Sequence, residues 1–319
     1  MYFFNMKPKL ISVVVPLFNE QDTVNELHDR LVMVLKNIGS EYEIIFVDDD
    51  STDGTFEKMK HLQPVTVLRL RKNSGQSAAL AAGIKSAKGD VIVTIDADLE
   101  NYPEDIPDMI SKLMDGHDVV SGWRKSRWNN QMLLRKIPSL LANRLIAYVS
   151  GAKLNDFGCT LRVYRRGVLD HIKLKGEEHR LVAAYAHILG ARLAEMEVRH
   201  SPRKFGESKY GMMRIFKVLL DVLALNFFHR YSERPIHFFG GIGFASFFLA
   251  FISFLGMVYF KYFGDKSFIS TPLPIIVAIF SIIGVQFILM GLLAEIFVRQ
   301  RSDEQKNTDF LIKEKIVNQ

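Results

Sequence analysis

Carboxylates gather at two places in this sequence, and each place directly follows an apolar run typical of a buried strand. Residues 43–55 read EIIFVDDDSTDGT, and residues 89–105 read GDVIVTIDADLENYPED. Asp96 and Asp98 stand on alternate positions, so they would lie about 6–7 Å apart along an extended chain. Carboxylates this close repel each other or take up protons, and a hard divalent cation relieves that repulsion. The pattern predicts a site for Mg²⁺ or Mn²⁺.

The alternative is a solvated acidic loop, which would be the better interpretation of an isolated Asp-x-Asp pair. Here the pair follows an apolar strand, precedes LENYPED at residues 99–105, and has a second acidic strand end upstream. Parallel sheets bind ligands beyond the carboxyl ends of their strands. We therefore expect the two acidic clusters to face each other across a ligand pocket.

The elements that must position these carboxylates alternate between strands and helices over residues 10–125. Continuous apolar strands alternating with helices predict an α/β fold with a mainly parallel sheet covered on both faces. Strands are predicted at 10–17, 42–49, 65–70 and 89–98, with further candidates at 117–122, 159–165 and 191–200. Helices are predicted at 19–38, just after 51–55, and at 75–87, 131–149 and 177–189.

Two long segments of the chain carry no charge. Residues 236–260 and 273–294 contain no Asp, Glu, Lys or Arg, and a helix needs roughly 20 apolar residues to cross a bilayer. Both segments are therefore predicted membrane spans. Lys and Arg concentrate before the first span and after the second, which predicts that both termini and the soluble domain are cytoplasmic. In a bacterium this would place the spans in the inner membrane. The N-terminus lacks the pattern of a signal peptide.

The segment before the first span looks interfacial. Residues 208–228 are mostly apolar and basic, with one polar stripe, which predicts a helix lying in the membrane interface. The amphipathic, basic helix at 131–149 fits either an interface or a protein core. The formal net charge is +6, but its positive residues lie beside the spans, where anionic membrane lipid accounts for them better than nucleic acid does. We expect no nucleic-acid partner.

The sequence resembles the membrane-bound polyprenyl-phosphate glycosyltransferases of glycosyltransferase family 2, which have the Rossmann-like GT-A fold. The resemblance covers nearly the whole chain, and its last two motifs with the paired spans are similar to dolichol-phosphate mannose synthases and bacterial undecaprenyl-phosphate sugar transferases, the formamido-arabinose transferases among them. The motifs are VVVPLFNE (13–20), VDDDSTDGT (47–55), RKNSGQSAAL (71–80), DADLENYPEDIP (96–107), NDFGCTLRVYRR (155–166) and RKFGESKYG (203–211). Two residues depart from the family pattern: Asp50 replaces a usual Gly, and Glu100 a usual Gln.

The resemblance implies transfer of one sugar from a UDP- or GDP-linked donor to undecaprenyl or dolichyl phosphate, at the cytosolic membrane face. The reaction would depend on Mg²⁺ or Mn²⁺ and invert the anomeric centre. The implied nucleotide-sugar site comprises Pro16, Asn19, Glu20, Asp48, Asp49, Asn73, Gly75, Asp96 and Asp98. The implied metal ligands are Asp96, Asp98 and Glu100. A carboxylate at Asp49 can accept the N–H groups of uracil or guanine, whereas Asp48 and Asp53 fit turn capping equally well.

The implied catalytic residues are Asp98, Asp156, Arg203 and Lys209. Asp156 fits three roles: stabilising an oxocarbenium-like centre, orienting a sugar hydroxyl, or accepting a proton. A strong base is not required, because a phosphate monoester is already mostly ionised at neutral pH, so catalysis should rest on positioning and electrostatics. The implied acceptor-phosphate site comprises Arg124, Arg127, Arg135, Arg203, Ser208 and Lys209. The single cysteine, Cys159, is interpreted as a packing residue.

The family resemblance divides the chain into a cytosolic GT-A domain (1–200), a phosphate-binding loop with an interfacial helix (201–235), two spans (236–298) and a cytosolic tail (299–319). A homo-oligomer is possible, since Gly240, Gly241 and Gly243 permit close helix packing. The alternatives are a catalytically silent nucleotide-binding scaffold, a transporter subunit and a processive polysaccharide synthase. The last would call for a Q-x-x-R-W motif and more spans.

Overall fold

The computed structural model describes residues 7–125, 133–170, 172, 180–202, 227, 231, 234–264 and 267–310, without the side chains of 133–139, 141–142 and 299–310. The chain divides into two compact units, Met1–Leu225 and Asn226–Gln319. Each unit has its own architecture, and they are described separately.

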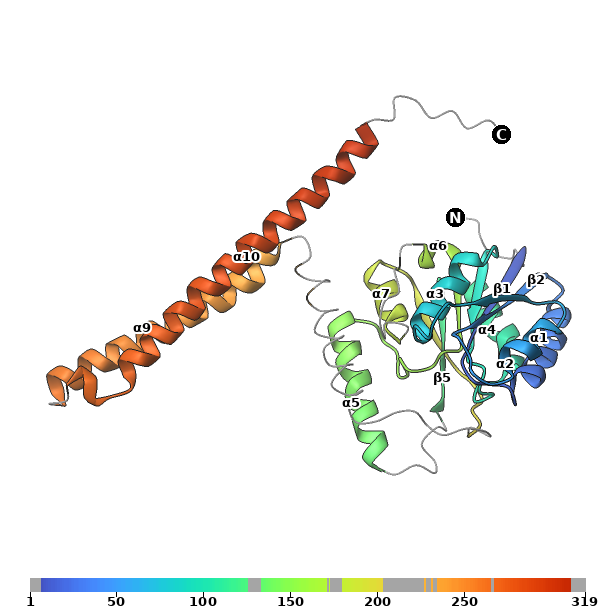
Figure 1. The fold of residues 1–319 in the computed structure, drawn as a ribbon, viewed down its shortest axis with the longest axis horizontal. Helices are drawn as coiled ribbons and strands as arrows, with labels where there is room; N and C mark the ends of the chain where they lie inside the picture. Colours follow the sequence, from blue (N-terminus) through green and yellow to red (C-terminus); the bar gives the residue numbers. More distant parts are fainter. Residues whose placement is uncertain are drawn as a thin grey trace. The chain divides into compact units, whose positions relative to one another are not determined.

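The first unit is built around one seven-stranded sheet with strand order β3-β2-β1-β4-β6-β5-β7 (Figure 1). The strands are β1 (Leu10–Leu17), β2 (Glu41–Asp48), β3 (Thr66–Arg69), β4 (Val91–Thr94), β5 (Val119–Trp123), β6 (Arg162–Arg165) and β7 (Leu193–Glu197). All neighbours pair in parallel except β6, which runs antiparallel to both β4 and β5. The predicted α/β fold with a mainly parallel sheet is confirmed.

Helices cover both faces of this sheet because its strand residues are apolar on both sides. Successive side chains of a strand point to opposite faces, so Val13 packs in a core with α1 and α4, while Val14 packs in a second core with α3 and α7. The helices of this unit are α1 (Val24–Ile38), α2 (Thr55–Lys60), α3 (Gln76–Ser86), α4 (Ile106–Met114), α5 (Leu133–Ser150), α6 (Arg166–Leu169) and α7 (Val182–Ile188), with a 3₁₀ turn at Pro103–Asp105.

The sequence left open whether the helix predicted at 131–149 packs on a protein core or lies in a membrane interface, and α5 bears on that choice. Ile146 is buried and packs with Phe157 and with Ala184 of α7 in a third small core. Tyr148 of the same helix is 81% exposed, and Leu145 is also exposed. The carboxyl-terminal half of α5 therefore packs on the rest of the first unit with one face and presents large side chains outward with another.

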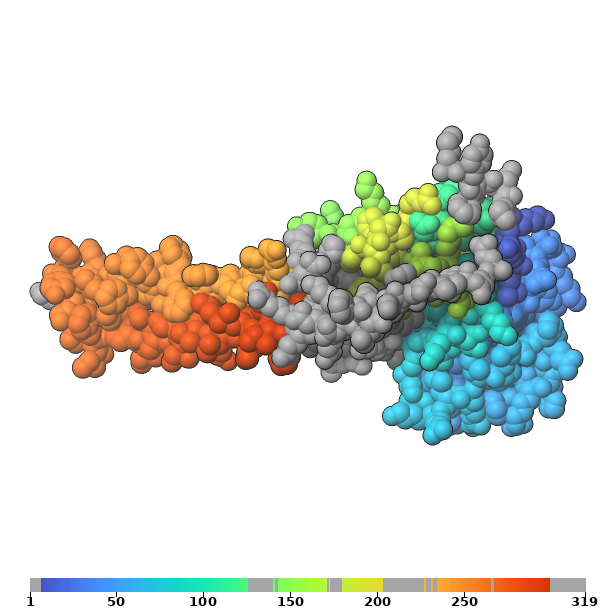
Figure 2. Space-filling view, turned by 90° about the horizontal axis from the view of Figure 1, so that it is seen from above, coloured from blue at the N-terminus to red at the C-terminus, as the bar shows by residue number. Residues whose placement is uncertain are grey.

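The second unit is a hairpin of two long apolar helices, α9 (Pro235–Phe263) and α10 (Leu273–Phe310), which pack side by side (Figure 2). Pro235–Phe263 and Leu273–Val298 are long and apolar enough to cross a membrane, with mean hydropathies of 2.1 and 2.6. Gly243 supports packing inside the hairpin, because a Cβ there would meet Ile288 at 2.8 Å. The apolar side chains elsewhere on the hairpin are largely exposed, as a lipid-facing surface would be.

Candidate functional site

Both acidic clusters lie at the same edge of the sheet, on either side of β1. Strand β1 pairs in parallel with β2 and with β4, so the carboxyl ends of all three strands share that edge. We call Asp48, Asp49, Asp50 and Asp53 the β2 rim. We call Asp96, Asp98 and Glu100 the β4 rim. The structure therefore brings the two predicted clusters to neighbouring strand ends.

In the β2 rim, Asp49 is buried and holds the turn that leads into α3. Its carboxylate accepts the backbone N–H of Ser74 at 2.7 Å and that of Gly75 at 2.8 Å. Gly75 has a φ of 87°, in the region that favours glycine. Asp49 thus fixes the turn that carries Asn73 and Gly75, and its contact with a nucleotide base stays a prediction.

Two neighbouring carboxylates of the β2 rim, Asp48 and Asp53, also accept backbone N–H groups of the turn. Asp48 is fully buried, accepts the backbone N–H of Ser51 at 3.1 Å, and lies 3.3 Å from Nε of Arg69. Asp53 accepts the N–H of Thr55 at 2.9 Å and its hydroxyl at 2.5 Å. Burial works to raise the pKa of Asp53, but the hydrogen bonds from Thr55 outweigh it and lower that pKa. Both side chains stabilise the turn.

Asp50 occupies a left-handed backbone conformation, with a φ of 62°. Glycine adopts this region at the lowest cost, and Asp is among the few other residues that tolerate it. The Asp50 carboxylate lies 3.2 Å from Nη2 of Arg69. The departure from the family pattern is therefore accommodated without losing the glycine-type turn.

The end of β1 is tied to this turn through Asn19. The Asn19 side-chain oxygen accepts the backbone N–H of Thr52 at 2.8 Å. The backbone N–H of Asn19 donates to the Ser51 hydroxyl at 2.9 Å. Glu20 follows with its N–H donated to the Thr55 hydroxyl at 2.8 Å. Pro16 lies within β1, in register with Val47. The predicted nucleotide-site residues of β1 and β2 are thus one connected structure.

The β4 rim has a different environment. Asp96 accepts a hydrogen bond from the side-chain amide of Gln76 at 2.6 Å and another from the Thr160 hydroxyl. Burial, and next the charge of Asp98, raise the pKa of Asp96 to about 7. Asp98 is buried and accepts the backbone N–H of Glu100 at 3.1 Å. Two carboxylates therefore share a site whose hydrogen-bond donors to Asp96 are neutral.

This rim suits a hard divalent cation. Its donor atoms are carboxylate oxygens, and Mg²⁺ commonly takes one or two carboxylates together with substrate phosphates. In the part of the chain that the structure describes, no three His, Cys, Asp or Glu side chains form a group able to hold a metal ion. Asp96 and Asp98 fit as a two-carboxylate site completed by a diphosphate, and Glu100 as a third ligand stays a prediction.

One turn contacts both rims. The backbone N–H groups of Ser74 and Gly75 bind Asp49, and the next side chain, Gln76, binds Asp96. The two acidic clusters therefore face the same turn at the start of α3. Gln76 lies within the motif RKNSGQSAAL, but nothing in its sequence neighbourhood predicted that it would reach Asp96, which is 20 residues away.

The structure also joins two residues that were predicted separately, Arg124 and Asp156. Nε and Nη2 of Arg124 lie 2.8 and 3.2 Å from the two Asp156 oxygens, and both side chains are buried. Burial works to lower the pKa of Arg124, but the charge and hydrogen bonds of Asp156, together with other acidic groups nearby, raise that pKa. The charge of Arg124 in turn acts to lower the pKa of Asp96. The ion pair therefore influences the β4 rim, and its role toward the acceptor phosphate stays a prediction.

Arg162 is a fully buried cation that sequence reasoning did not single out. Its guanidinium donates to the Phe157 carbonyl at 2.6 Å and to the Ser121 hydroxyl at 3.2 Å, so it braces the loop that carries Asp156. The adjacent Cys159 is fully buried, and burial raises the pKa of its thiol to about 11. Both facts agree with Cys159 as a packing residue.

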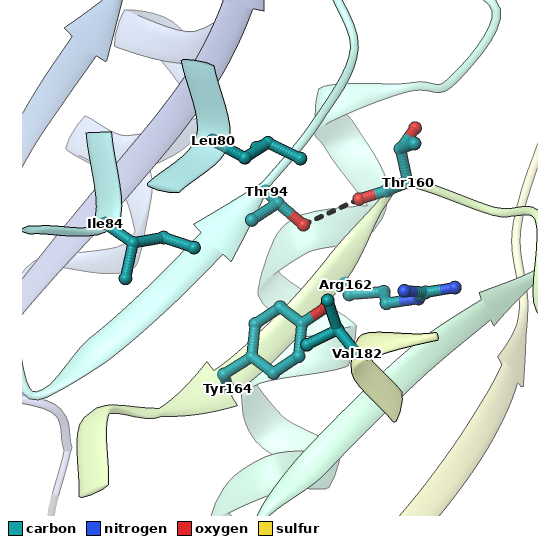
Figure 3. A pocket seen from close by; sticks show the side chains of 7 residues that line it. All are labelled: Leu80, Ile84, Thr94, Thr160, Arg162, Tyr164 and Val182. Atoms are coloured by element: carbon teal, nitrogen blue, oxygen red, sulfur yellow. Dashed lines mark hydrogen bonds between the residues drawn. The ribbon is translucent and has the colours of Figure 1, made fainter. Parts of the chain in front are cut away.

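A small cavity lies beside these residues (Figure 3). The Thr94 hydroxyl donates to the Thr160 carbonyl at 2.7 Å on its wall. Its volume is about 10 Å³, close to what one water molecule needs, so it is not a nucleotide pocket. The lining residues are Leu80, Ile84, Thr94, Thr160, Arg162, Tyr164 and Val182.

Several predicted site residues lie outside the described residues. These are Arg127, Arg203, Ser208 and Lys209, and for Arg135 only the backbone, within α5, is described. The chain leading into the 203–211 motif does start at the β4 rim, because Ser201 donates its N–H to the Glu100 carbonyl at 3.0 Å.

The chain is similar to characterised proteins in sequence. The family model for glycosyl transferase family 2 matches residues 12–173, a span that contains both rims and the Arg124–Asp156 pair. The chain is also 37% identical, over 312 residues, to the dodecaprenyl-phosphate galacturonate synthase of Rhizobium johnstonii, covering 95% of this chain and 92% of that protein.

Solved structures show the same fold. Mannosyl-3-phosphoglycerate synthase from Rubrobacter xylanophilus matches with a TM-score of 0.55 at 18% identity, over 68% of this chain and 74% of that one. Glucosyl-3-phosphoglycerate synthase from Mycobacterium tuberculosis, crystallised with Mn²⁺, UDP and phosphoglyceric acid, matches with a TM-score of 0.53 at 18% identity, over 69% of this chain and 78% of that one. The predicted GT-A fold is thereby confirmed. Because the family model matches half of the chain and the Rhizobium synthase is similar over nearly all of it, this chain belongs to glycosyltransferase family 2.

Proposed function

We propose that this glycosyltransferase moves a single sugar from a UDP- or GDP-linked donor to a polyprenyl phosphate at the cytosolic face of a membrane. The supporting observation is the 37% identity to a dodecaprenyl-phosphate galacturonate synthase, which extends over 95% of the chain and so includes the apolar hairpin. An acceptor with a polar phosphate and a lipid tail suits a chain that combines a catalytic unit with two candidate spans.

The β4 rim is the proposed cation site. Asp96 and Asp98 would hold Mg²⁺ or Mn²⁺, with Glu100 as a possible third ligand. The metal, when bound, neutralises charge that develops on the leaving nucleoside diphosphate. The protein supplies the two carboxylates in the turn that follows β4, and Gln76 orients one of them.

The donor and the acceptor are both anions, so the site must supply compensating positive charge. Arg forks match phosphate oxygens well, and we assign the acceptor phosphate to Arg124, Arg127, Arg135, Arg203, Ser208 and Lys209. The acceptor oxygen is already ionised, and positioning it in line with the leaving diphosphate inverts the anomeric centre. An α-linked donor would thus give a β-linked lipid-phosphate sugar.

The membrane arrangement follows from charge. Lys and Arg flank the two candidate spans on the side of the termini, which supports cytoplasmic termini and a cytoplasmic catalytic unit, in a bacterial inner membrane. Residues 208–228 would lie in the interface as an amphipathic helix and bring the acceptor phosphate to the site while its tail stays in the bilayer.

The test is a transfer assay with purified full-length protein and radiolabelled sugar donors. Donors are UDP- and GDP-linked hexoses and a UDP-linked uronic acid; acceptors are undecaprenyl phosphate, dolichyl phosphate and undecaprenol, which has the tail without the phosphate. We expect lipid-soluble label only with a phosphorylated acceptor and added Mg²⁺ or Mn²⁺. Label on undecaprenol, or polymer formation, would contradict the proposal. A protein that binds nucleotide but transfers nothing would be the silent scaffold.

A further inference from the structure

Glu195 on β7 binds the loop that carries Asp156, and the reaction proposed above gives it no role. One carboxylate oxygen accepts the backbone N–H of Asn155 at 2.8 Å and that of Asp156 at 3.0 Å. The other oxygen accepts the side-chain amide of Asn155 at 2.6 Å. Glu195 therefore holds the loop backbone at the residue whose side chain pairs with Arg124.

Glu195 and Arg124 are both positioned by the paired strands β5 and β7. In the parallel pair of β5 and β7, Glu195 is in register with Ser121, and Arg124 follows the end of β5 at Trp123. The Ser121 hydroxyl also accepts a hydrogen bond from Arg162, which in turn binds the loop at Phe157. The Asp156 loop is thus fixed from two adjacent strands.

The Asp156 carboxylate has little capacity left to accept a proton. Its oxygens accept both fork nitrogens of Arg124 and the backbone N–H of Gly158 at 2.9 Å. Hydrogen bonds and a cation at this distance favour the ionised carboxylate and weaken it as a base. The remaining nitrogen of the guanidinium, Nη1 of Arg124, takes no part in the two hydrogen bonds to Asp156, and a guanidinium nitrogen is a strong donor to an oxyanion.

We propose that Glu195 is a positioning residue for sugar transfer, acting through Asp156 to aim the Arg124 guanidinium at the phosphate groups of the reaction. In this arrangement Asp156 works as the anchor of Arg124 and does not accept a proton from the substrate. The inference rests on the proposed transfer to a polyprenyl phosphate. Because Glu195 contacts only Asn155 and Asp156 in this network, its contribution must disappear when Asp156 can no longer hold Arg124.

The first measurement is independent of substrate. Hydrogen exchange of the peptide covering 154–159, followed by mass spectrometry in full-length protein, reports the Asn155 and Asp156 amides directly. We expect faster exchange in Glu195→Ala, and wild-type exchange in Glu195→Gln, which retains an oxygen for both amides. Glu197→Gln is the matched control, since Glu197 is on the same strand and exposed. Unchanged exchange in Glu195→Ala overturns the proposal whatever the substrate.

The second measurement is turnover, assayed well below the lowest melting temperature of the set. We expect Glu195→Ala to lower kcat about 10- to 100-fold, by analogy with residues that orient the ligands of a metal ion, with Glu195→Gln and Glu197→Gln close to wild type. Glu195→Ala combined with Asp156→Asn should be no slower than Asp156→Asn alone. Independent, multiplicative losses would overturn the proposal, as would an acidic limb of the kcat–pH profile that Asp156→Asn removes. A wild-type enzyme without turnover on any polyprenyl phosphate would instead refute the proposed function.

Discussion

The two acidic rims have similar sequences but opposite electrostatic environments. In the β2 rim, Asp49 binds two backbone N–H groups, Asp53 binds Thr55, and its pKa is lowered. In the β4 rim, Asp96 receives hydrogen bonds from neutral groups and lies beside another carboxylate, Asp98, so its pKa is raised to about 7.

We expect this difference to separate carboxylates that stabilise the fold from carboxylates that bind a ligand. A carboxylate that caps a turn is stabilised in its charged form by the donors it holds, and the protein is complete without a ligand. Two carboxylates that lie close together retain an electrostatic cost that a cation removes. We therefore expect the β2 rim to hold the turn before α3 in place, and the β4 rim to bind the cation.

Removing a carboxylate of the β4 rim should have the largest effect on activity. We expect Asp98→Ala to lower turnover at least about 10²-fold, the scale of losing one major electrostatic contact in an active site, while the protein still inserts into membranes. Asp53→Asn, which alters a turn cap in the β2 rim, is the matched control and should retain most turnover. Equal losses in both variants would erase the distinction between the rims.

In the β2 rim, the largest effect on stability is expected at Asp49. Asp49→Ala removes the buried carboxylate that accepts the backbone N–H groups of Ser74 and Gly75, and losing these hydrogen bonds to a charged group costs about 1–3 kcal/mol. Thermal unfolding of the purified protein measures this loss. Because the same turn carries Gln76, the KM for the sugar donor should rise as well. A melting temperature equal to that of the wild type would show that the turn does not depend on Asp49.

Neutralising one carboxylate of each rim should change the stability of metal-free protein in opposite directions. A raised pKa means that ionised Asp96 destabilises the fold, fully above pH 7 and progressively less as the pH falls toward 4. Asp96→Asn should therefore raise the stability at pH 8 by on the order of 1 kcal/mol, an advantage that shrinks below pH 7.

Asp53 has a lowered pKa, so its stabilising effect is present above its unfolded value and is lost as the pH falls through the folded one. Asp53→Asn should lower the stability at pH 8 by about 1 kcal/mol. Melting curves of both variants in EDTA at pH 6 and pH 8 provide the comparison. Shifts of the same sign in the two variants would contradict it.

The smallest effect is expected at Asp50. Asp50→Gly relieves the cost of a left-handed backbone conformation. It also removes a partly exposed ion pair with Arg69 and raises the conformational entropy of the unfolded chain, and both of these changes lower the stability. These effects offset one another, so the free energy of unfolding should change by less than about 0.5 kcal/mol, with turnover unchanged. A larger loss of stability would show that the ion pair with Arg69 stabilises the turn, although the Arg69 side chain is partly exposed.

The sequence was sufficient to place both rims, because apolar strands followed by carboxylates mark strand ends in a parallel sheet. It was not sufficient to distinguish them, since the partners come from other segments: Ser74, Gly75 and Gln76 reach the rims only through the turn before α3. The pairing of Arg124 with Asp156 likewise depends on tertiary structure, because Arg124 follows β5 and Asp156 lies in the loop before β6, the strand that pairs with β5.

Some features were missed although a local signal existed. Helix α4 has Ile106, Met109, Ile110 and Leu113 buried at helical spacing, a pattern that sequence alone contains. Glu195 and Arg162 carried no such signal, because a charged residue in a strand does not reveal whether it is solvated or bound to a loop. Their roles required the tertiary structure.

Binding of Mn²⁺ together with UDP or GDP tests the central claim most directly. Titration of full-length protein with Mn²⁺ in the presence of each nucleotide, followed by electron paramagnetic resonance, measures the bound ion without requiring turnover. We predict saturable binding by the wild type and Asp53→Asn, and its loss in Asp96→Asn and Asp98→Asn. Binding that survives both β4-rim substitutions, or disappears with Asp53→Asn, would contradict the assignment of the cation to the end of β4.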